Sequence, residues 1–63
     1  MTGSIKLRFP DVGDVTFSAK PTTTGTVIIE MAFSEAVLRC EVSADDAGTM
    51  ADTLRTAAEG SAA

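Results

Sequence analysis

The chain has 63 residues, a net charge of −4, one cysteine and no histidine, which excludes an intrachain disulfide and argues against a bound metal or other cofactor. A domain this short buries only about 60% of the surface that its unfolded chain exposes, so without a covalent or metal staple we expect a homodimer. The acidic balance makes nucleic acid and anionic membranes poor partners, because both are bound by basic surfaces.

The first third of the chain predicts a β-hairpin. Apolar and polar residues alternate over 4–9 and again over 14–20, which is the period of strands with one buried face. Between them lies a segment with Pro, Asp and Gly, which is typical of a turn. If the loop is 11–13, Phe9 lies opposite Val15 and the apolar residues of both strands share one face.

A second hairpin is expected after a threonine-rich turn. Its strands cover 26–33 and 36–42, and the turn is Ser34-Glu35, although these residues lack the usual glycine or asparagine. The register supports this turn, because it also places Glu30 opposite Arg39 on the polar face. The apolar pairs that it creates are Phe33 with Ala36, Met31 with Leu38, Ile29 with Cys40 and Val27 with Val42.

The C-terminal segment predicts one amphipathic helix. Ser43 is expected to cap its N-terminus, with Asp46 in the capping-box position. We expect the helix to end at Gly60 and residues 61–63 to form a frayed tail. Its apolar stripe consists of Ala47, Met50, Ala51, Leu54, Ala57 and Ala58.

Together these elements predict one α+β domain over residues 1–60. It is a four-stranded antiparallel β-meander, in the order 1-2-3-4, followed by a helix that packs on one sheet face. Cys40 alternates with core-facing residues, so we expect its thiol to be buried and structural. The face under the helix is expected to carry Ile5, Leu7, Phe17, Ile29, Met31, Leu38 and Cys40.

The other face of the predicted sheet is the candidate interaction surface. Ile28 is a large apolar residue that the register leaves on this face, away from the core. Mixed charges around a small apolar centre suit a two-fold interface, so we expect two such faces to meet. Pairing of an edge strand, 4–9 or 36–42, with its symmetry mate is the alternative route. The candidate interface residues are Ile28, Glu30, Ala32, Val37, Arg39 and Glu41.

Candidate catalytic groups are few. The sequence offers carboxylates, hydroxyls and one thiol, and helix capping already accounts for Asp45 and Asp46. We therefore expect no enzyme but a protein-interaction or regulatory module with a protein partner. The charges at Lys6 and Arg8 do not fit an export signal, no apolar run is long enough to span a membrane, and a free thiol suits a reducing cytoplasm.

Residues 42–58, with the sequence VSADDAGTMADTLRTAA, resemble the strand-to-helix ending of many short uncharacterised proteins of actinobacteria and their phages. This resemblance implies a small phage accessory protein that acts on a host protein.

Four strands followed by a helix are also similar to the Whirly-type single-strand binders. That resemblance implies a face that binds single-stranded nucleic acid, and this is the alternative function. The chain departs from the pattern because Phe9, Phe17 and Phe33 all fall on the predicted core face, which leaves no aromatic platform for bases. The basic residues that share the sheet face opposite the predicted helix are Lys6, Arg8, Lys20 and Arg39.

Overall fold

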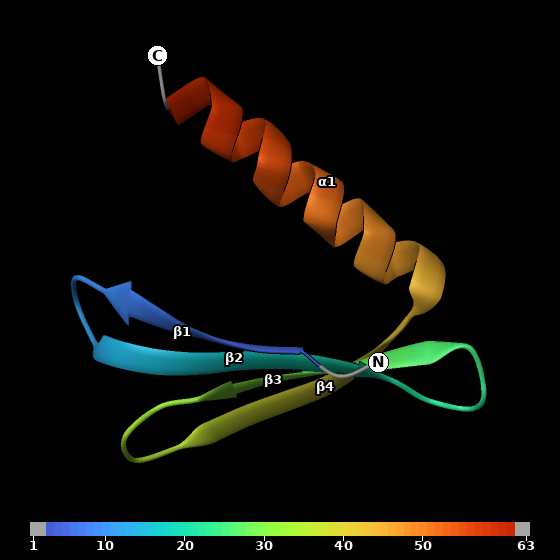
Figure 1. The fold of residues 1–63 in the computed structure, drawn as a ribbon, viewed down its shortest axis with the longest axis horizontal. Helices are drawn as coiled ribbons and strands as arrows, with labels where there is room; N and C mark the ends of the chain where they lie inside the picture. Colours follow the sequence, from blue (N-terminus) through green and yellow to red (C-terminus); the bar gives the residue numbers. More distant parts are fainter. Residues whose placement is uncertain (1–2, 62–63) are drawn as a thin grey trace.

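The structure, a computed structural model, describes residues 3–61 (Figure 1). It contains the strands β1 (Gly3–Phe9), β2 (Gly13–Pro21), β3 (Thr26–Ala32) and β4 (Val37–Ser43), and the helix α1 (Ala44–Ser61). The strands form one antiparallel sheet in the order β1-β2-β3-β4, and the helix lies on one side of it. The predicted α+β fold and strand order are therefore confirmed.

The β3–β4 hairpin has the predicted register. Glu30 lies opposite Arg39, and the Phe33 N–H donates to the Ala36 carbonyl oxygen at 2.8 Å across the turn Ser34-Glu35. The turn holds without glycine because a one-residue slip would turn the apolar side chains of one strand away from those of the other. The remaining apolar pairs are also as predicted: Met31 with Leu38, Ile29 with Cys40 and Val27 with Val42.

The predicted register of the β1–β2 hairpin is wrong by two residues. Phe9 lies opposite Gly13 instead of Val15, and Leu7 is the residue opposite Val15. Gly13 has a φ of +85°, a conformation that glycine adopts easily, so the strand pairing resumes at Gly13 directly after the loop 10–12. Because a shift of two residues preserves the alternation, the apolar residues still share one face.

The threonine-rich turn between β2 and β3 is held by its own side chains. The Thr22 N–H donates to the Thr26 carbonyl oxygen at 3.0 Å. The Thr22 hydroxyl oxygen accepts from the N–H groups of Thr24 at 3.2 Å and Thr26 at 3.3 Å. Gly25 supplies the left-handed residue, with φ of +85°. Thr22 therefore has a structural role.

β4 continues into α1 without an intervening loop. Ser43 is the last residue of β4, and its Oγ accepts a hydrogen bond from the Asp46 N–H at 3.0 Å, which confirms the predicted cap. The Ala44 N–H donates to the Gly25 carbonyl oxygen at 3.2 Å, so the helix start is also tied to the β2–β3 turn. No helix in residues 3–61 is long and apolar enough to cross a membrane.

The helix runs one residue further than predicted. It ends at Ser61, where the side-chain hydroxyl donates to the Ala58 carbonyl oxygen at 3.0 Å, and Gly60 is accommodated inside the last turn. Of the expected frayed tail, Ala62 and Ala63 lie outside the described residues.

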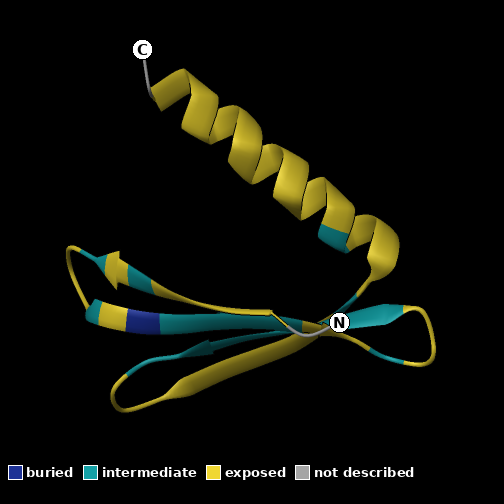
Figure 2. Cartoon of the chain, in the orientation of Figure 1, coloured by how far each residue is buried: buried dark blue, intermediate teal, exposed yellow. Residues whose placement is uncertain are grey.

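α1 packs against the sheet mainly through its N-terminal end and then rises away from it (Figure 1). Ala47 is the one half-buried residue of α1, and among the described residues Val15 alone is fully buried (Figure 2). The radius of gyration is 13.0 Å, whereas a compact domain of this length has about 10.6 Å. We call the side of the sheet that α1 faces the inner face, and the opposite side the outer face.

The prediction of a buried thiol at Cys40 is wrong. Cys40 lies on the inner face, opposite Ile29, as the alternation predicts, but its side chain is exposed. The reason is that α1 leaves the sheet before it covers the middle of β4.

Two glycine substitutions should have opposite effects on stability. Gly25→Ala should lower the free energy of unfolding by about 1 kcal/mol, because alanine resists positive φ. Gly48→Ala, inside α1, should raise it by roughly 0.5–1 kcal/mol. An added Cβ meets no atom within 4 Å at either position, so both changes report on the backbone alone. Urea unfolding at one protein concentration measures them, and shifts of the same sign would contradict these conformations.

Candidate functional site

A hollow of about 570 Å³ lies between α1 and the inner face of the sheet. Met50 and Leu54 form its helix side, and within residues 3–61 Arg39 is the one charged residue that borders it. We call this hollow the inner groove. Its sheet side includes Leu7, Phe17, Ile29, Met31, Leu38 and Cys40.

The inner groove leaves large apolar side chains in contact with water. Leu54 of α1 is 68% exposed and Leu38 of β4 is 61% exposed. Met50 of α1 is exposed as well, whereas the exposed Ile5 of β1 lies outside the groove lining. Contiguous exposed apolar surface is typical of sites that bind a protein or another ligand, whereas isolated exposed hydrophobic residues are common on any surface.

The six predicted interface residues come together on the outer face. The β3–β4 register sets them side by side as three cross-strand pairs, because β3 contributes one member of each pair and β4 the other. Ile28, Glu30 and Ala32 are half-buried, however, so they present less apolar surface than their position suggested. The pairs are Ile28 with Glu41, Glu30 with Arg39 and Ala32 with Val37.

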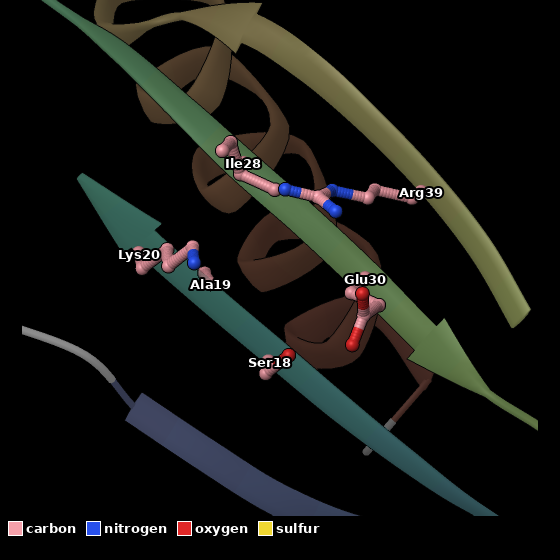
Figure 3. Close-up of a pocket in the computed structure, with 6 residues that line it drawn as sticks. All are labelled: Ser18, Ala19, Lys20, Ile28, Glu30 and Arg39. Atoms are coloured by element: carbon pink, nitrogen blue, oxygen red, sulfur yellow. The ribbon is translucent and has the colours of Figure 1, made fainter. Parts of the chain in front are cut away.

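A second hollow of about 230 Å³ lies on the outer face (Figure 3). Ile28 forms its apolar part, and Lys20, Glu30 and Arg39 bring charges of both signs to it. In Figure 3 the Arg39 side chain extends from β4 across β3 toward Ile28. Long charged side chains therefore shield the residue that was expected to form the centre of a face-to-face interface.

The four predicted basic residues of the outer face do not form one positive stripe. Arg8 lies opposite Asp14 on the neighbouring strand, and Arg39 lies opposite Glu30. Lys6 and Lys20 are on β1 and β2, respectively. Carboxylates thus interrupt the positive charge that a phosphate backbone needs.

Neither surface has the donor set of a metal centre. Within residues 3–61, no three His, Cys, Asp or Glu side chains lie close enough to hold a metal ion. No family model, curated protein or solved structure matches the chain. The function of the chain is therefore inferred from the inner groove and the outer face.

The inner groove was missed from the sequence because the helix was expected to cover the inner face. One sequence feature could have indicated it. Ser43 is both the end of a strand and the cap of the helix, so no loop residue is left to turn the helix back over the sheet.

A dye for exposed apolar surface tests the inner groove. Anilinonaphthalene sulfonate should fluoresce with the dilute native protein, and Leu54→Asp should lower that emission. Thr56→Asp is the matched control, because it adds the same charge to α1 at a residue that does not line the inner groove. Equal loss of emission in both variants would show that the dye does not bind in the groove.

Proposed function

We propose that the chain is a non-enzymatic protein-interaction module that acts as a homodimer in the cytoplasm. The observation that carries this proposal is the inner groove, an apolar face whose only cover within the described chain is a helix held at one end. Burial of such a face against another chain is favourable by about 25 cal/mol for each Å² of apolar surface removed from water.

The size of the accessible surface supports a second copy as the cover. The chain exposes 4979 Å², whereas a folded monomer of 6.5 kDa exposes about 3,800 Å². The excess is about 1,200 Å² for each chain, so a dimer that removed it from both copies would bury about 2,400 Å². Obligate homodimers bury roughly 2,000–5,000 Å², and the excess falls in that range.

The inner side supports the dimer better than the outer face does. Leu38, Met50 and Leu54 are exposed beside the inner groove, whereas Val37 is the large apolar residue that is exposed on the outer face of the described strands. Because apolar area drives association more than mixed charge does, we assign the dimer contact to the inner side and its edge.

A binding role is better supported than catalysis. Among the described residues, Arg39 is the one charged residue that lines the inner groove, and its side chain extends over the outer face, so the groove offers no pair of groups for acid–base or nucleophilic chemistry. The outer face remains free for a further protein partner. That this partner is a host protein of a phage rests only on the resemblance of residues 42–58 described above.

The dimer should make stability depend on concentration. A tenfold rise in protein concentration should raise Tm by roughly 5 °C, because unfolding of a dimer releases two chains. Sedimentation equilibrium should give twice the chain mass of 6.5 kDa. A single-chain mass at ~100 μM, with a constant Tm, would overturn the proposal.

The same sample also tests the alternative function, which is binding of single-stranded nucleic acid. Labelled single-stranded DNA should not shift in a gel at low salt, because carboxylates lie opposite Arg8 and Arg39. A salt-sensitive shift that Lys6→Glu abolishes would support a nucleic-acid binder instead.

A further inference from the structure

This inference rests on the proposed homodimer and names its contact. We infer that two copies pair through their β4 strands, antiparallel, about a two-fold axis at Cys40. β4 is an edge strand of the sheet, and nearly all of its residues are exposed. An exposed edge offers unpaired N–H and C=O groups to another strand.

Two hydrogen bonds show which backbone groups of β4 are free. The Ala36 carbonyl oxygen accepts from the Phe33 N–H at 2.8 Å, and the Ala44 N–H donates to the Gly25 carbonyl oxygen at 3.2 Å. Residues 36 and 44 therefore both direct a backbone group toward the β3 side of β4. In an antiparallel pair, this direction alternates along the strand. The backbone groups that point to the free edge therefore belong to Val37, Arg39, Glu41 and Ser43.

The charges of β4 select one register. When the axis passes through Cys40, Arg39 of each copy lies opposite Glu41 of the other, and Leu38 lies opposite Val42 on the inner face. An axis through Arg39 or Glu41 sets like charges directly opposite. An axis through Leu38 or Val42 shortens the ladder and separates the opposite charges. The Cys40 register alone uses the whole strand and pairs every charge.

The hydrogen bonds of the selected register also match. The backbone groups of Arg39 and Glu41 both point outward, so they can exchange N–H···O=C bonds across the axis. The Glu41 Oε2 already accepts from the Thr26 hydroxyl at 2.5 Å. Its other carboxylate oxygen can accept from the Arg39 guanidinium of the second copy when that side chain turns from Ile28 to the strand edge.

The other edge of the sheet does not suit a symmetric pair. β1 carries Lys6 and Arg8 and no acidic residue. A two-fold pair of β1 strands would therefore bring four positive charges together. Pairing of β1 with β4 of another copy is head-to-tail, and repetition of it would give a ring or an open filament instead of a two-fold dimer.

The β4 pair joins the two inner faces. A two-fold axis perpendicular to the sheet keeps both α1 helices on the same side, over one continuous sheet of two four-stranded halves. Leu38 and Cys40 line the inner groove of each copy, so the two grooves meet at the axis. The exposed apolar side chains of β4 then lie in the middle of the joint sheet.

The native cysteine reports on this register. Cys40 and its symmetry mate form a directly opposed pair that is not hydrogen-bonded, with Cα atoms about 4.5 Å apart. A disulfide accepts Cα separations of about 4.4–6.8 Å. Under diamide, two Cys40 thiols should each give up one proton and one electron, so that one S–S bond forms and the azo group is reduced to a hydrazine. The expected product is a covalent dimer in high yield.

A displaced thiol is the matched control. Leu38 lies on the same face as Cys40 and is 61% exposed. In Cys40→Ser/Leu38→Cys, the two thiols should be roughly 13 Å apart along the strand, so diamide should give little covalent dimer. Adding Val42→Cys to that variant should restore the cross-link, because positions 38 and 42 face each other across the axis.

A charge swap gives a second, non-covalent test. Arg39→Glu should raise the dissociation constant of the dimer roughly tenfold, because two cross-strand pairs become like-charged. Arg39→Glu/Glu41→Arg should recover most of the affinity. Both variants lack the Glu30–Arg39 pair within the chain, so recovery in the double variant is a property of the contact between copies.

The outcomes separate this inference from the proposed function. The β4 register is overturned, and the homodimer still stands, if the protein sediments as a dimer but cross-links at position 38 as readily as at Cys40. The same conclusion follows if Arg39→Glu/Glu41→Arg does not recover the affinity of the dimer. Dissociation by Ile28→Asp, without an effect of Arg39→Glu, assigns the contact to the outer face and also overturns the register. A single-chain mass overturns the homodimer and the register together.

Discussion

The direct passage of β4 into α1 at Ser43 is the constraint on which the rest of the structure depends. The Ser43 hydroxyl oxygen accepts a hydrogen bond from the Asp46 N–H, and the Gly25 carbonyl oxygen accepts one from the Ala44 N–H. These two bonds fix the first turn of the helix to the end of the sheet. The direction in which the helix starts is therefore set by the strand that precedes it, and α1 rises from the sheet at an angle (Figure 1).

Several separate features of the molecule follow from that angle. The apolar stripe of α1 stands apart from the inner face, so the inner groove stays open and Leu54 is exposed. Cys40 and Leu38 are exposed for the same reason, although the alternation places them on the core side. The chain thus has a complete set of secondary-structure elements but a core with one side missing.

How far the sequence predicted the structure depended on how many independent signals agreed. For β3–β4, the apolar alternation and the Glu30–Arg39 pair both selected one register, and it was right. For β1–β2, the register depended on placing the loop at 11–13 from its turn residues, and alternation could not correct this because it does not distinguish registers that differ by two residues. The exposure of Cys40 was not predictable in this way, because a strand pattern indicates which face a residue occupies and not what covers that face.

The strictly sequential order of the sheet has a consequence for how the protein folds. Every strand pairs with its neighbour in the chain across a short turn. Such local contacts close small loops, so the sheet can form quickly within one molecule. In the dimer that we propose, β4 gains its second neighbouring strand from another molecule, so completion of the joint sheet is a second-order step. Newly made chains at low abundance would then pass through a monomeric stage with secondary structure in place and apolar surface open, and their rate of maturation would follow the rate of synthesis.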